Sequence, residues 1–161
     1  MAKFEDKLQM LLQNYLSDNG FTVDIRVNNN EDWYYESDFR FINATMRRDP
    51  VIDSWFRELC DELGLEWNCP MFLLSMLHEL GHDETIDDFT EFEWDLPSFY
   101  TFLKGVMIEE EPSKEDYMTY FRSPREIVAT DWAIAYANEE KEGLRALWSE
   151  IIELFEEYVY G

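Results

Sequence analysis

The chain of 161 residues is poor in basic residues, and this shortage already narrows its function. Thirteen lysines and arginines stand against 36 aspartates and glutamates, so the formal net charge is −23. A sequence-independent nucleic-acid binder needs a basic face, and docking on an anionic membrane needs basic clusters. The composition therefore argues against direct binding to nucleic acid or to a membrane, and it suits a soluble protein with basic partners.

Long apolar runs and cysteines are scarce as well. No run approaches the roughly 20 residues of a membrane-spanning helix, and the N-terminal sequence MAKFEDKLQM lacks a signal-peptide core. We therefore expect a cytoplasmic protein. Cys60 and Cys69 are too few for a disulfide framework, and in a reducing compartment we expect both to be free thiols.

The residues that are abundant predict one folded domain over 1–161. Hydrophobic residues make up 46% of the chain and aromatic residues 17%, which is enough for a core and excludes a wholly disordered chain. Apolar spacing, N-cap residues and Gly or Pro breaks predict the elements. Helices are expected over 3–18, 50–63, 70–82, 96–104, 113–121, 124–138 and 144–159, and strands over 21–27, 33–35 and 39–42.

This order of elements is typical of an α+β fold that is mostly helical, with a small antiparallel sheet. The helix that follows Pro70 has apolar residues on nearly all sides, as expected for a buried helix. The segment 83–95 carries seven acidic residues and no basic one, so we expect a loop or a solvated segment there.

The only two histidines of the chain lie in the sequence His78-Glu79-Leu80-Gly81-His82. Residues four apart on a helix share a face, so both imidazoles can reach one metal ion. Glu79 lies beside that face and can accept a proton from a water that the metal activates. The pattern predicts a Zn²⁺ site with Glu79 as the general base.

Two histidines do not complete such a site, because catalytic zinc usually has three protein ligands. The best candidate for the third ligand is Glu126, on a helix in which the small Ala129 would allow a close approach. Glu126 could instead form a capping box with Ser123, since the two are three residues apart at a helix start. The other candidate ligands are Asp83, Asp87, Asp88, Asp131 and Cys69.

The two motifs together resemble the zincin metallopeptidases of the ImmA/IrrE kind, a family common on phages and mobile elements. His78, Glu79 and His82 match its HExxH motif. Glu126, Ala129, Trp132 and Ala133 match its later motif, while Thr130 stands where Asn or Asp is usual and Asp131 follows it. No third histidine follows His82, so the metzincin signature is absent.

The resemblance implies a zincin-like domain in which the sheet packs against the HExxH helix. It further implies zinc bound by His78, His82 and Glu126, hydrolysis of peptide bonds in a protein or peptide substrate, and, for a phage protein, action in the host cytoplasm. The stretch 83–122 between the motifs is long for the family and suggests an acidic insertion. Family members stabilise the oxyanion with a His or Tyr, for which Tyr117, Tyr120 and Tyr136 are candidates here.

The acidic composition supports an alternative function. Closely spaced carboxylates can imitate a phosphate backbone and occupy the basic groove of a nucleic-acid enzyme, as a phage anti-defence inhibitor would do. Candidate surfaces are 83–95, 109–111 and 153–157, and the zincin scaffold could serve such a protein without turnover. If the protein is a peptidase with an acidic groove, its substrates should be basic.

Overall fold

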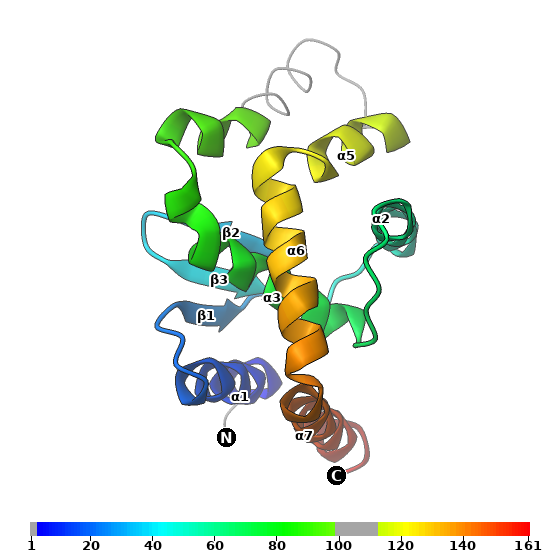
Figure 1. Cartoon of the computed structure of the whole chain (residues 1–161). Helices are drawn as coiled ribbons and strands as arrows, with labels where there is room; N and C mark the ends of the chain where they lie inside the picture. The colour runs from blue at the N-terminus through cyan, green and yellow to red at the C-terminus, as the bar shows by residue number, and fades with distance from the viewer. Residues whose placement is uncertain (1–2, 99–112) are drawn as a thin grey trace.

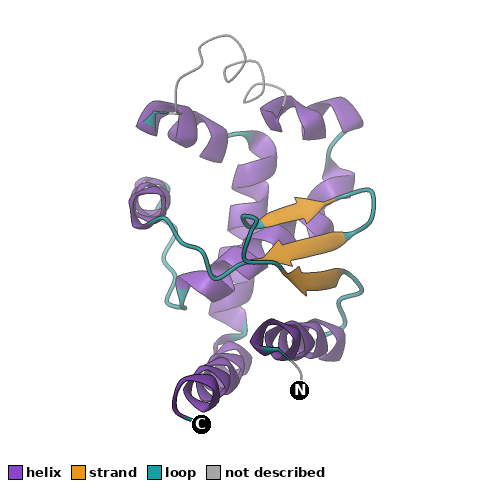
Figure 2. Ribbon diagram, turned by 180° about the vertical axis from the view of Figure 1, so that it is seen from behind, coloured by secondary structure: helices purple, strands orange, loops and turns teal. Residues whose placement is uncertain are grey.

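The computed structural model describes residues 3–98 and 113–161, which form an α+β fold that is mostly helical. A long central helix, α3 (Met71–Thr85), packs against a small sheet on one side and against α6 (Pro124–Glu139) on the other. Figures 1 and 2 show the other helices arranged around this unit. They include α1 (Phe4–Asp18), α2 (Pro50–Glu62), α5 (Lys114–Phe121) and α7 (Lys141–Tyr160), together with a short helix at 91–98.

In the described part of the chain, the strands form a mixed three-stranded sheet rather than an antiparallel one. β3 (Phe41–Ala44) lies in the middle, parallel to β1 (Asp24–Val27) and antiparallel to β2 (Tyr34–Glu36). β2 and β3 form a hairpin, and β1 pairs with the other edge of β3. The predicted antiparallel sheet is wrong in this respect, because alternation of apolar residues sets which face of a strand is buried and not its direction.

Side chains of α1 cover the outer edge of β1. The side-chain amide oxygen of Gln13 accepts a hydrogen bond of 2.9 Å from the Ile25 backbone N–H. The side-chain amide oxygen of Gln9 accepts one of 2.9 Å from the Val27 backbone N–H. An open strand edge is a site for unwanted pairing, so this cover protects the sheet. It also fixes the sheet between α1 and α3.

The core runs through all of these layers. Leucines of α1 are fully buried against the sheet, and α3 is buried on nearly every side, as its sequence predicted. Small residues of α6 and large ones of α7 complete the cluster. Its members with almost no exposed surface include Leu8, Leu12, Leu16, Ile42, Leu73, Leu74, Met76, Leu77, Leu80, Ala133, Leu147 and Ile151.

Several helix boundaries follow local signals that the sequence shows. The Asp49 carboxylate accepts from the backbone N–H groups of Val51 and Ile52 at the start of α2. Gly64 follows the helix with a φ of +70°, a left-handed conformation that glycine adopts without strain. A capping box joins Ser113 and Asp116 at the start of α5.

The segment 83–95 is more ordered than its charge suggested. α3 continues through Thr85, a 3₁₀ turn covers Ile86–Asp88, and residues 91–98 are helical. The rest of the helix expected over 96–104, and the acidic run 109–111, lie outside the described residues. Within residues 3–98 and 113–161, no helix is long and apolar enough to cross a membrane.

Candidate metal centre

The site depends on a very close approach of α3 and α6. A Cβ atom at Gly81 would lie 2.7 Å from the carbonyl oxygen of Ala129, which is closer than real Cβ atoms come to such an oxygen. Glycine on one helix and alanine on the other therefore allow the two backbones to meet. This contact brings the first turn of α6, which carries Glu126, beside the last turns of α3, which carry the two histidines.

His78, His82 and Glu126 converge at this contact. Nε2 of His78 lies 3.1 Å from Oε1 of Glu126, and Nε2 of His82 lies 3.0 Å from its Oε2. One possible ligand atom from each residue falls in a group whose members are all within 4.8 Å of one another. Two imidazole nitrogens and a carboxylate oxygen are a donor set that suits zinc.

The outer nitrogen of His78 is held by Thr130. Nδ1 of the imidazole lies 3.1 Å from the Thr130 hydroxyl oxygen, one turn along α6 from Glu126. When Nδ1–H donates to this oxygen, the lone pair of the imidazole is on Nε2, the atom that faces Glu126. Among the described residues, the buried Nδ1 of His82 has no hydrogen-bond partner.

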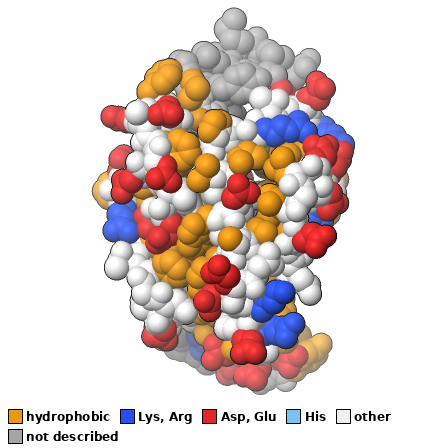
Figure 3. Space-filling model, in the orientation of Figure 1, with side chains coloured by type: hydrophobic (Ala, Val, Ile, Leu, Met, Phe, Trp, Pro, Cys, Tyr) orange, Lys and Arg blue, Asp and Glu red, His pale blue; other side chains and the backbone are white. Residues whose placement is uncertain are grey.

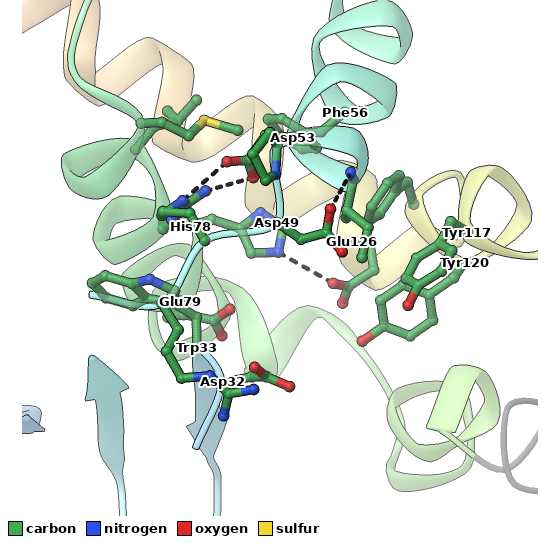
Figure 4. A pocket seen from close by; sticks show the side chains of 18 residues that line it. Asp32, Trp33, Asp49, Asp53, Phe56, His78, Glu79, Tyr117, Tyr120 and Glu126 are labelled. Carbon is green, nitrogen blue, oxygen red and sulfur yellow. Dashed lines mark hydrogen bonds and ion pairs between the residues drawn. The ribbon is translucent and has the colours of Figure 1, made fainter. Parts of the chain in front are cut away.

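An open pocket of about 960 Å³ leads to the cluster. His78, Glu79 and Glu126 form part of its wall, and Tyr117 and Tyr120 form another part (Figure 4). Apolar side chains flank His78, and the remaining wall comes from α2, from the loop before it and from the residues just before β2. These further lining residues include Trp33, Arg47, Arg48, Asp49, Asp53, Phe56, Met71, Leu74 and Phe121.

The two carboxyl groups of the site have opposite pKa shifts. Burial opposes ionisation of Glu126, but the imidazoles of His78 and His82 hold its pKa well below the ordinary value. Burial raises the pKa of Glu79, which is 9% exposed. Glu126 therefore stays an anion suited to bind a cation, while Glu79 is shifted toward the range in which a carboxylate accepts a proton readily.

Arg125 is a residue of the site that the sequence analysis did not single out. Its guanidinium is buried and donates a hydrogen bond of 3.0 Å to Oε2 of Glu126. It also bonds to the helix at 91–98 and to Tyr120. The ring of Trp94, from the same helix, packs edge-on against His82 at a centroid distance of 5.2 Å. Neither residue belongs to a sequence motif, so nothing in the local pattern indicated them.

The alternative roles considered for these residues are not what the structure shows. Ser123 begins α6, but its hydroxyl donates to the Tyr120 carbonyl oxygen at 2.7 Å, and the Glu126 carboxylate faces the histidines. The predicted capping box is therefore not formed. Of the other candidate ligands, Asp83 is bound to Arg40 and Tyr35, and Asp87, Asp88 and Asp131 are exposed. Cys69 lies outside the cluster, and both cysteines are free thiols.

Of the three tyrosines considered for oxyanion stabilisation, two line the pocket and one does not. Tyr136 is remote from the pocket: its hydroxyl pairs with that of Tyr15 at 2.9 Å, and its ring stacks on Trp132. Tyr117 and Tyr120 line the pocket. Burial and then the charge of Glu126 raise the pKa of Tyr120, so its hydroxyl keeps its proton and can donate it in a hydrogen bond.

The acidic side chains do not gather in one tract on the face drawn in Figure 3. They are scattered among apolar side chains there. Within the segment 83–95, the side chain of Asp83 is only 5% exposed and is engaged in an ion pair, whereas the other six acidic residues are exposed, as predicted for a solvated segment.

Comparison with known protein families, with curated proteins and with solved structures gave no match to this chain.

Proposed function

We propose that the protein is a zinc-dependent peptidase of the zincin type. The observation that carries this proposal is the convergence of His78, His82 and Glu126 beside Glu79 in an open pocket. A binding module or an inhibitor does not need a buried His₂–carboxylate cluster together with a free, buried carboxylate next to it. In such a site zinc would act as a Lewis acid that polarises the scissile carbonyl and activates water.

The protein's own residues have distinct roles in this reaction. His78, His82 and Glu126 hold the metal, and Thr130 orients the His78 ring. Glu79 accepts a proton from the attacking water and then delivers it to the leaving amine. Tyr120, a neutral donor in the pocket wall, hydrogen-bonds the oxyanion that forms on the substrate carbonyl.

We propose that the substrate is a basic peptide or protein segment. The described lining of the pocket has five carboxylates, from Asp32, Asp49, Asp53, Glu79 and Glu126, against the two guanidiniums of Arg47 and Arg48. Asp53 neutralises Arg48 through two hydrogen bonds of 2.6 and 3.0 Å, which leaves the pocket acidic. The free thiols fit the cytoplasm as the place of action, which would be the host cytoplasm for a phage protein.

The test starts from metal content and hydrolysis. Protein purified without a His tag should hold about one zinc per chain, measured by elemental analysis. His82→Ala should lose the zinc. Glu79→Gln should keep it but lower the hydrolysis of a Lys/Arg-rich peptide mixture by about 10²–10⁴-fold, because the proton acceptor is gone. Glu84→Gln, at an exposed position on the same helix, is the matched control and should change neither quantity.

Each outcome separates the hypotheses. Failure of the wild type to take up zinc would contradict the metal site. Zinc binding with equal hydrolysis in wild type and Glu79→Gln would contradict the peptidase. Salt-sensitive competition with DNA for a basic protein, unchanged by Glu79→Gln, would instead support the acidic inhibitor.

A further inference from the structure

Among the described residues, which include all eight arginines, Arg125 is the only buried arginine and the other seven are exposed. It is 8% exposed, and a buried arginine is costly unless its charge and its donors find partners. Three groups provide them: the Glu126 carboxylate, the Tyr120 hydroxyl and the helix at 91–98. All three touch the candidate metal centre or its pocket.

The donors of Arg125 are distributed over these groups. Nε donates to Oε2 of Glu126 at 3.0 Å, and Nη1 donates to the backbone carbonyl of Trp94 at 2.6 Å. Nη2 donates to the hydroxyls of Ser98 and Tyr120 at 3.1 and 3.0 Å. The planar fork of the guanidinium therefore fixes the three groups relative to one another.

We propose that Arg125 is a positioning residue that sets the orientation of the Glu126 carboxylate for metal binding. The proposal rests on the metal site proposed above. Its hydrogen bond engages Oε2 and so restricts rotation of the carboxylate, which keeps Oε1 directed at Nε2 of His78. A carboxylate without this bond would sample other rotations, and part of the binding energy of the metal would go into ordering it.

Arg125 also links the described ends of the stretch 83–122 to the site. Through Trp94 and Ser98 it anchors the helix at 91–98, whose Trp94 ring covers His82. Through Tyr120 it anchors α5. Because Arg125 occupies a lone pair of the Tyr120 oxygen, the phenolic proton is directed to another partner, and Tyr120 lines the pocket. The helix at 91–98 therefore contacts the metal site through Trp94, and α5 forms part of the pocket wall.

Charge and orientation have opposite effects on metal affinity, which makes the role testable. A guanidinium repels a divalent cation, so a purely electrostatic effect predicts tighter zinc binding when Arg125 is neutralised. Positioning predicts weaker binding. Arg125→Lys keeps the charge but cannot reproduce the fork, whereas Arg125→Gln removes both.

The experiment measures the zinc dissociation constant by competition with a chromophoric chelator, and the visible absorption spectrum of the Co²⁺-loaded protein. We expect both Arg125→Lys and Arg125→Gln to bind zinc about 10–100-fold more weakly, as for other groups that orient metal ligands, and the Co²⁺ spectrum to change. Arg122→Gln, which removes an exposed arginine paired with Glu62, should leave both unchanged. In a Glu126→Ala background, Arg125→Gln should not weaken zinc binding further.

Other results would overturn the proposal. Unchanged or tighter zinc binding in both variants of a wild type that binds zinc would overturn the role of Arg125 and leave the metal site intact. An equal loss of affinity in the Glu126→Ala background would show a general structural effect instead. No zinc binding by the wild type would overturn the metal site as well. If Arg125→Gln does not fold, as judged by circular dichroism, Arg125→Lys and its Co²⁺ spectrum decide.

Discussion

At the scale of single residues, the Thr130 hydroxyl is the partner of the His78 ring nitrogen that faces away from Glu126. Its oxygen lies 3.1 Å from Nδ1 of His78, and Thr130 itself is buried. Thr130→Val keeps the shape of the side chain but leaves Nδ1 without this partner. We expect about 10-fold weaker zinc binding, measured by chelator competition. Thr130→Ser, which keeps the hydroxyl, should bind like the wild type, and equal affinities of all three proteins would contradict this role.

Gly81 has a second function besides its place in the histidine motif. The backbone of Ala129 occupies the space that a side chain at Gly81 would need. We expect Gly81→Ala to lower the free energy of unfolding by about 1–3 kcal/mol despite the better helix propensity of alanine. It should also weaken zinc binding, because α6 carries Glu126. The measurements are urea unfolding in the presence of a chelator and zinc competition.

Gly143 provides the matched control for this substitution. It lies in α7, and a Cβ atom there would meet nothing within 4 Å. Gly143→Ala should therefore leave zinc binding unchanged and raise stability by up to about 1 kcal/mol. Equal behaviour of the two alanine variants would show that the close approach of α3 and α6 is not needed.

At the scale of elements, Asp83 ties the end of α3 to the sheet. Its carboxylate accepts from the Tyr35 hydroxyl of β2 at 2.6 Å and from two nitrogens of Arg40, just before β3, at 2.9 and 3.0 Å. Burial opposes its ionisation, but the hydrogen bonds from Arg40 and Tyr35 hold the pKa of Asp83 below its ordinary value. The ionised carboxylate is therefore the form that joins these elements.

This shift predicts a pH dependence with a definite sign. A carboxyl group with a lowered pKa in the folded state contributes stability above its unfolded pKa, near 3.9, and the contribution is lost as the pH falls through the folded value. Asp83→Asn should lower the free energy of unfolding by about 1 kcal/mol at pH 7. The effect is small because Arg40 is half exposed and water screens the ion pair. The difference should vanish in acid below the folded pKa. Urea unfolding at several pH values measures it, and Asp87→Asn, at an exposed position, should show no difference at any pH.

The elements differ in how far the sequence could predict them. The histidine pair was predictable because helix geometry alone places residues 78 and 82 on one face. The approach of Glu126 was predictable as a possibility, since Ala129 is small, but its capping alternative was resolved only by the packing of α6 on α3. The direction of β1 and the contacts of Arg125 with Trp94 and Ser98 were not predictable, because each joins residues far apart in the chain without any local pattern.

At the scale of the whole molecule, the net charge of −23 acts on stability as well as on partners. Like charges repel across the folded surface, and the repulsion weakens when salt shortens the Debye length from about 30 Å at 0.01 M to about 3 Å at 1 M. Exposed acids at Glu150, Glu153 and Glu156 follow one another along α7. They contribute to this repulsion.

Neutralising these three residues isolates the effect. The triple variant Glu150→Gln, Glu153→Gln, Glu156→Gln changes the net charge from −23 to −20 without touching the pocket. In a chelating buffer of low salt it should unfold at higher urea, with a gain of about 0.5–1 kcal/mol from relieved like-charge pairs. Arg145→Gln, an exposed change of opposite sign on the same helix, should destabilise under those conditions. Both differences in the free energy of unfolding should disappear at about 1 M NaCl, because salt screens the charge repulsion that causes them. Differences that persist at high salt would instead show that local packing or helix propensity of α7, and not the charge of the molecule, sets its stability.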